Sequence, residues 1–304
     1  MNIAEIISLT RSEILDDEIR PYGWTDVGLV RHFNRAYDEL ARETYCIVDS
    51  STVSVCQVPL LANQSLHATS PKVLKILSTW LNSNGYPFDR KTEAFMNGYF
   101  NWRATTGTYP YWLVMDSQNR NIVPYPKYDT TGYIVGASNI TFAAVGKTIT
   151  KVGETFTSHY VTGDSIVVTG SLSNNGTLTL SNVTDTILTV NETPVNEVLC
   201  SATLQKVRDT VLMRVARLPL VVYTANDLEL ATPPTPELDA TYHYGLMDGI
   251  AKYAYLKQDS ETYDPQKSKR HGDVFKEFKS DVALEVSILT ESGNSQCYPN
   301  VGTL

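Results

Sequence analysis

The chain has 304 residues, of which 42% are hydrophobic, and a formal net charge of -8. This length predicts one large or two ordinary domains, and the apolar content excludes global disorder. No stretch approaches the roughly 20 apolar residues that a membrane span needs, and the first residues lack a basic segment followed by a hydrophobic run. We therefore expect a protein that is made and kept in a cytosol, without a membrane partner. The acidic charge argues against a general attraction to nucleic acid phosphates.

Two amphipathic helices are predicted at the start of the chain. Apolar residues recur at three- and four-residue intervals over residues 2–19, and Pro21 ends the pattern. A second helix is expected to begin at Trp24-Thr25-Asp26, with Thr25 as its N-cap. The elements expected next are strands at 45–60 and 73–78, a turn at 84–85, a helix at 91–102 and a hairpin of 111–115 with 121–125.

Between about Thr130 and Thr203 the composition changes to Thr, Ser, Val, Gly and Asn with few charges. This composition favours strands and turns and predicts an inserted all-β module. The expected strands are 140–144, 148–152, 165–169, 176–180 and 187–190. Short strands at this spacing are typical of a small barrel or sandwich.

After residues 210–220, which alternate as a strand, the last third of the chain is predicted to be helical. Thr235-Pro236-Glu237 and Asp264-Pro265 each combine a capping residue with a first-turn proline. Gly245 and Gly249 are four residues apart and are expected to allow a close approach between helices. The final residues, 290–304, have too few apolar side chains to fold alone and are predicted to be an extended arm.

The expected fold class is α+β: a mainly α-helical bundle with a small mixed or antiparallel sheet and an inserted all-β barrel or sandwich domain. The helical core is expected to be discontinuous, over 1–129 and 204–289, with the insertion at 130–203 and the arm at 290–304.

Residues that would carry catalysis or hold a metal are sparse. The five histidines lie far apart, the four cysteines have no metal-binding spacing, and nucleotide-binding and nucleophile motifs are missing from the sequence. The best cluster is Asp259, Glu261 and Asp264, but Asp264 is expected to cap a helix before Pro265. We therefore expect no enzyme, no cofactor and no metal.

Several landmarks occur in an order that resembles head-to-tail adaptor proteins of podovirus-like phages. These are Trp24-Thr25-Asp26, then Trp102 with Thr105-Thr106-Gly107 and Pro110-Tyr111, then Arg217-Leu218-Pro219-Leu220, and finally the segment 254–267. The resemblance covers about 1–127 and 203–289. Two features depart from it: Gly28 replaces the usual acid of the second helix, and the β insertion instead resembles small modules of phage virion proteins.

The resemblance implies a virion protein of the phage neck, made in the host bacterial cytoplasm. Its partners would be a dodecameric ring of its own copies, the portal protein above, and tail, nozzle or fibre proteins below, while DNA passes without specific binding. The C-terminal arm would bind the portal through Thr290, Ser292, Asn294, Gln296, Tyr298, Pro299 and Leu304. Acids facing the lumen would be Glu13, Asp16, Asp17 and Glu18.

Two alternatives remain open from the sequence. One is a virion-associated cell-wall hydrolase that uses paired carboxylates, either Glu237 with Asp239 or the Asp259 group. The other is a protein that binds a fibre, a capsid protein or a host glycan through the β insertion.

Overall fold

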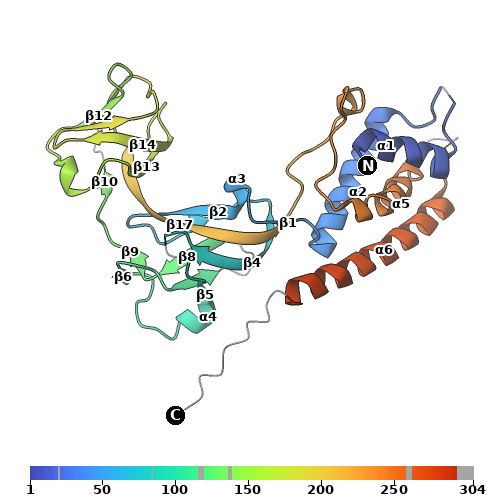
Figure 1. The fold of residues 1–304 in the computed structure, drawn as a ribbon, viewed down its shortest axis with the longest axis horizontal. Helices are drawn as coiled ribbons and strands as arrows, with labels where there is room; N and C mark the ends of the chain where they lie inside the picture. The colour runs from blue at the N-terminus through green and yellow to red at the C-terminus, as the bar shows by residue number, and fades with distance from the viewer. Residues whose placement is uncertain (20, 84, 116–119, 136–138, 258–261, 293–304) are drawn as a thin grey trace, which may run out of the picture. The chain divides into compact units, whose positions relative to one another are not determined.

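A computed structural model of the chain describes residues 1–19, 21–83, 85–115, 120–135, 139–257 and 262–292, with backbone alone at 290–292. The chain divides into two compact units (Figure 1). The helical unit comprises residues 1–50, 72–77 and 214–304, and the β-rich unit comprises residues 51–71 and 78–213.

The helical unit is built from helices at both ends of the chain. They are α1 (Ile3–Leu9), the π-helix η1 (Thr10–Leu15), α2 (Asp26–Thr44), the 3-10 helices η3 (Ala225–Leu228) and η4 (Ala240–Tyr242), α5 (Gly245–Ala254) and α6 (Pro265–Ser292). The predicted caps of α2 and α6 are confirmed: Thr25 accepts from the amide of Gly28, and Asp264 accepts from the amides of Gln266 and Lys267.

Helices α2, α5 and α6 pack around one apolar core, and α5 makes the closest approach. A Cβ added at Gly245 would lie 2.3 Å from the Phe278 ring, and one added at Gly249 would lie 2.7 Å from the Cβ of Ala36. The prediction that these glycines permit close helix packing is confirmed. The core of the unit includes Ile6, Phe33, Tyr37, Leu246, Ile250, Phe275 and Val282.

Most of the strands belong to the β-rich unit. They are β2 (Gln57–Leu61), β3 (His67–Ala68), β5 (Asp89–Thr92), β6 (Thr106–Gly107), β7 (Trp112–Met115), β8 (Asn121–Tyr125), β9 (Lys127–Tyr128), β10 (Tyr133–Val135), β11 (Ile140–Ala143), β12 (Thr148–Lys151), β13 (Ser165–Thr169), β14 (Gly176–Val183), β15 (Ile187–Val190) and β16 (Glu197–Cys200). Short helices α3 (Val53–Cys56), α4 (Glu93–Met96) and η2 (Phe156–Ser158) lie among them. β1 (Val48–Asp49) belongs to the helical unit, while β4 (Val73–Leu81) and β17 (Thr203–Arg217) have residues in both units.

The long strand β17 organises the main sheet. The sheet has eleven strands including β17: eight follow the order β1-β17-β13-β14-β15-β12-β11-β16, and β2, β4 and β10 also pair with β17. A second sheet, β3-β8-β7-β5, contains the predicted hairpin of β7 with β8, and β6 pairs with β9. β17 can serve so many partners because different parts of its length pair with different strands: Val211 with Val58 of β2, and Leu204 with Ile134 of β10.

The expectation of a mainly α-helical bundle is wrong, because the chain is mostly β and only 31% helical. The expected helix at 91–102 is one cause: its first residues form β5, which pairs in parallel with β7, and only the four residues of α4 follow as helix. The sheet partner overrides the helical spacing of the aromatic residues in this segment.

The strands predicted in the insertion lie close to their expected ranges, but the sheet does not close into a barrel. β11, β12, β13 and β15 match the expected ranges to within one residue, and β14 runs three residues further, to Val183. The expected barrel is wrong. Among the described strands the order is open, because β16 pairs with β11 alone and so provides no closing partner.

Candidate interaction surfaces

A buried arginine joins separate segments of the helical unit. Arg217, at the end of β17, is 7% exposed, and its Nε donates to Asp49 at 2.6 Å while Nη1 donates to Glu237. Burial alone would lower the pKa of Arg217, but the hydrogen bonds to Glu237 and Asp49 raise it. The sequence singled out Arg217 as a landmark without indicating this structural role.

Glu39 is the second charged centre of the helical unit. Its carboxylate accepts from Lys252 of α5 at 2.9 Å, from Lys279 of α6 at 2.5 Å and from the hydroxyl of Tyr253. Burial would raise the pKa of Glu39, but the hydrogen bonds from Lys279, Tyr253 and Lys252 lower it to about 2. The negative charge on α2 is therefore held by groups from two other helices.

The described carboxylates of the hydrolase alternative each bind another group of the helical unit and do not form a catalytic pair. Glu237 binds Arg217, and its amide donates to the hydroxyl of Tyr37. The helix expected to begin after Thr235 is wrong, because η4 and α5 are the first helices that follow it. Asp239 caps η4 by accepting from Thr241, and Asp264 caps α6. Asp259 and Glu261 lie outside the described residues.

The acids expected to face a lumen divide into two kinds. Glu13, Asp16 and Glu18 are exposed. Asp17 is 7% exposed, forms a salt bridge with Arg11, and accepts from the amide of Gly23 at 2.7 Å. Asp17 thus stabilises the turn before α2, whereas the role of the other three in lining a passage stays a prediction.

The expected portal-binding arm falls mostly beyond the described part of the chain. Thr290 and Ser292 belong to the backbone of α6, which runs to Ser292 and so past the expected end at 289. Asn294, Gln296, Tyr298, Pro299 and Leu304 lie outside the described residues.

Among the described residues, no group of three or more His, Cys, Asp or Glu side chains is arranged to hold a metal ion. In the same part of the chain, no helix has the length and apolar character needed to cross a membrane. Cys46, Cys56 and Cys200 form no disulfide with one another.

A hollow of about 380 Å³ between α2 and α5, which we name the basic pocket, carries several cations and no carboxylate. Arg31, His32 and Arg35 line it from α2, and Lys257 lines it from the end of α5. Burial and the charges of Arg31 and Arg35 lower the pKa of His32. The guanidinium groups of Arg31 and Arg35 give this pocket a positive potential, which suits a negatively charged partner.

The exposed face of α6 carries a row of acids, with Lys269 and Arg270 beside its first members. Asp273, Glu277 and Asp281 recur every four residues, and we name them the acidic ridge. All three are exposed, and none has an ion pair or side-chain hydrogen bond within the described part of the chain. Like charges at this spacing destabilise a helix by about 0.2–0.5 kcal/mol per pair, so the pattern does not favour α6 in isolation.

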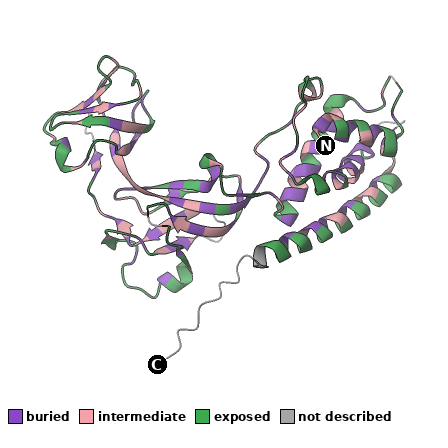
Figure 2. Cartoon of the chain, viewed as in Figure 1, coloured by how far each residue is buried: buried purple, intermediate pink, exposed green. Residues whose placement is uncertain are grey.

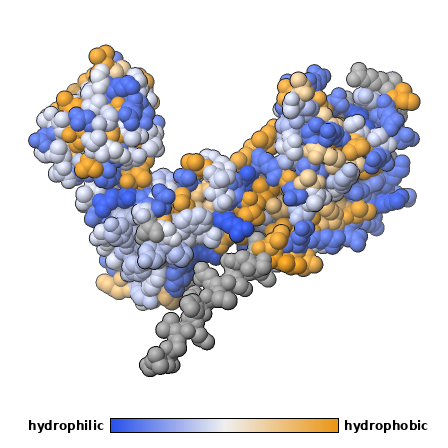
Figure 3. Space-filling model, viewed as in Figure 1, coloured by the Kyte–Doolittle hydropathy of each residue, from blue (hydrophilic) through white to orange (hydrophobic). Residues whose placement is uncertain are grey.

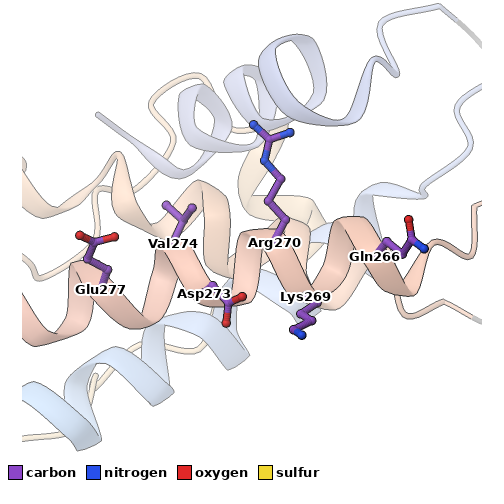
Figure 4. Close-up of a pocket in the computed structure, with 6 residues that line it drawn as sticks. All are labelled: Gln266, Lys269, Arg270, Asp273, Val274 and Glu277. Carbon is purple, nitrogen blue, oxygen red and sulfur yellow. The ribbon is translucent and has the colours of Figure 1, made fainter.

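The acidic ridge adjoins a hollow of about 440 Å³ whose lining, among the described residues, comes from α6 alone; Figure 4 shows its six side chains. A lining from one helix makes this hollow a surface groove and not an enclosed ligand site. The same face continues with exposed Leu284 and Ile288, and Figure 2 shows exposed residues along much of α6. Hydrophobic atoms reach the surface near the C-terminal end of α6 in Figure 3.

The β-rich unit has an exposed aromatic surface. Tyr86, Tyr109 and Tyr111 line a hollow of about 370 Å³ with Pro87 and Pro110, and all three tyrosines are more than half exposed. Behind them, Trp112 stacks on Tyr125 at 5.5 Å between ring centroids. Their exposure excludes these tyrosines from the core of the unit.

The insertion presents one braced loop. The carboxylate of Glu197 on β16 accepts from Ser171 Oγ at 2.5 Å, from the amide of Leu172 at 2.9 Å and from Asn174 Nδ2 at 3.0 Å. These bonds hold the loop while the side chain of Leu172 remains 92% exposed. An apolar side chain on a fixed backbone is typical of a contact residue.

Protonation of Glu197 is expected to release this loop. The hydrogen bonds from Ser171 and then from the amide of Leu172 lower the pKa of Glu197 from 4.5 to about 2. The bracing is therefore complete above pH 4.5 and is lost as the pH falls toward about 2. Amide hydrogen exchange of residues 171–175 should accelerate over this range. In Glu197→Gln the exchange should be fast at pH 7 and independent of pH after correction for the intrinsic rate; an unchanged pH profile would contradict the bracing role.

Comparison with protein families gives a match over most of the chain. The model of the family described as SU10 adaptor protein matches residues 1–285, which includes the β insertion and all but the last turns of α6. Comparison with curated proteins gives no match. Because the family match extends over far more than half of the sequence, this chain belongs to the SU10 adaptor protein family of phage adaptors.

Proposed function

We propose that the chain is a structural head-to-tail adaptor of a tailed bacteriophage. Its copies form a ring under the portal, extend the DNA channel and provide the surface to which the tail attaches. The observation that carries this proposal is the family match over residues 1–285.

The exposed surfaces of both units support a role in assembly. The acidic ridge and the basic pocket lie on the helical unit, and the aromatic surface lies on the β-rich unit. Exposed apolar patches with polar rims mark protein contacts, and tyrosine is enriched at such contacts. The carboxylates considered for a hydrolase, where described, instead bind backbone amides or Arg217.

Within the ring, Glu13, Asp16 and Glu18 face the passage and repel DNA, so that it moves without being held. The arm at 290–304 docks on the portal. A second role, contact with a fibre, a capsid protein or a host glycan, is favoured by the braced loop that exposes Leu172 on the insertion.

Electron microscopy of the full-length chain mixed with the portal of the same phage tests the proposal. We expect ring-shaped density that continues the portal channel. A chain ending at Ser292 should occupy fewer portals, because it lacks most of the arm. A chain lacking residues 132–202 should still form the ring and lose only a peripheral component. A stable monomer that leaves every portal bare would contradict the adaptor function.

A further inference from the structure

The helical unit carries two surfaces of opposite charge on different helices. The basic pocket presents Arg31 and Arg35, which are exposed and four residues apart on α2, with Lys257 beside them. The acidic ridge presents Asp273, Glu277 and Asp281 at the same four-residue spacing on α6. Both rows place one charged side chain on about each helical turn, so their charges have the same spacing along the two helix axes.

Neither surface is used up inside one copy. Arg31 has no ion pair or hydrogen bond in the described part of the chain, and Arg35 contacts only the ring of Tyr253, 4.0 Å from its centroid. The acids that the helical unit does neutralise with its own bases lie elsewhere, as Glu39 and Asp17 show. Arg31 and Arg35 and the three acids of the ridge thus keep their charges available to another molecule, whereas Lys257 already donates to the carbonyl of Gly23 at 2.9 Å.

We propose that the acidic ridge of one copy docks in the basic pocket of the next copy, which links the helical units head to tail. A contact between two different surfaces of the same chain is heterologous, and repeated around a closing rotation it generates a ring. This inference rests on the proposed adaptor function and adds to it the lateral contact of the ring.

The apolar groups next to the charges fit the same contact. Leu256 at the rim of the basic pocket is 47% exposed, and Leu284 and Ile288 follow the acidic ridge on the exposed face of α6. Charges fix the register and orientation of such a contact, and the apolar side chains exclude water from it. A DNA phosphate would satisfy the cations but would leave these apolar groups without a partner, so we favour a second copy of this chain.

Charge reversal in both surfaces tests the contact. The ridge variant is Glu277→Lys with Asp281→Lys, and the pocket variant is Arg31→Glu with Arg35→Glu. The multimers formed by the full-length chain are measured by native mass spectrometry or mass photometry, alone and with portal. Each variant by itself should need about tenfold or more protein to assemble, because like charges would face each other. An equal mixture of the two should assemble as the unchanged chain does, since each provides the charge that the other lacks.

The matched control is Asp185→Lys with Glu229→Lys, which changes the net charge as the ridge variant does at exposed acids outside the contact and outside the proposed passage. It should assemble normally. Circular dichroism confirms that each variant is folded.

If the two variants assemble like the unchanged chain, or if their mixture fails to assemble, the contact is refuted while rings on the portal still support the adaptor function. Weaker binding of a short DNA duplex by the pocket variant with unchanged assembly would assign the pocket to phosphates and also refute it. If the unchanged chain neither assembles nor binds portal, the adaptor function itself fails.

Discussion

Replacing Gly249 with alanine should lower the free energy of unfolding of the helical unit by about 2 kcal/mol. The added Cβ would lie 2.7 Å from the Cβ of Ala36 on α2 and 3.0 Å from Cζ of Phe275 on α6. Both neighbours are fully buried. Neither has space to turn away, so the three helices that meet at Gly249 would have to separate and lose contacts along their length.

Gly272→Ala provides the matched control for this prediction. Gly272 lies within α6, where an added Cβ would make only an ordinary contact, 3.7 Å from Lys252. Alanine is the better helix former, so this change should stabilise the unit by about 0.5–1 kcal/mol. Urea unfolding followed by far-ultraviolet circular dichroism measures both variants. Equal effects of the two substitutions on the free energy of unfolding would show that close packing at Gly249 does not limit the stability of the helical unit.

Replacing Arg217 with leucine should cost the chain about 3–5 kcal/mol of stability, because two carboxylates would be left without their cation. Asp49 is 8% exposed and has Arg217 as its charged partner at 2.6 Å. Glu237 loses the same partner, although it keeps the amides of Leu220 and Val221 as donors. The segment after β17 would then be joined to β1 and to the loop before α5 by weaker contacts.

Arg214→Leu is the matched control, because Arg214 lies on the same strand, is exposed, and has no ion pair or hydrogen bond within the described residues. Its effect should stay within about 0.5 kcal/mol. Thermal and urea unfolding compare the two variants. If Arg217→Leu were no more harmful than Arg214→Leu, the buried ion pairs would contribute little to the helical unit.

Local sequence signals predicted the elements that depend on neighbouring residues. The caps at Thr25 and Asp264 were confirmed because a capping side chain bonds to amides two or three residues away. Four of the five strands expected in the insertion were placed to within one residue because β-branched runs between glycine turns carry that information locally, whereas β10 and β16 were not expected. The close helix approach at Gly245 and Gly249 was equally visible.

The candidate contact surfaces could be predicted from the sequence only in part. The four-residue repeats of Asp273, Glu277 and Asp281, and of Arg31 and Arg35, are present in the printed residues. The apolar residues Phe275 and Val282 indicate the core-facing side of α6, and their burial leaves the acidic ridge in solvent. The sequence alone does not tell which of the exposed charges find partners within the same copy.

The amino-acid sequence by itself determined the family, the starts of α2 and α6 and the boundaries of most strands expected in the insertion, since each of these depends on short-range patterns. Only the tertiary structure decided that the chain is mostly β, that residues 91–102 join a sheet, and that Glu237 binds Arg217 and does not begin a helix. Those outcomes depend on partners distant in the chain: β7 pairs with β5, and an arginine on β17 reaches a carboxylate 20 residues later. Pairing and burial of such partners outweigh the small free-energy differences between local conformations.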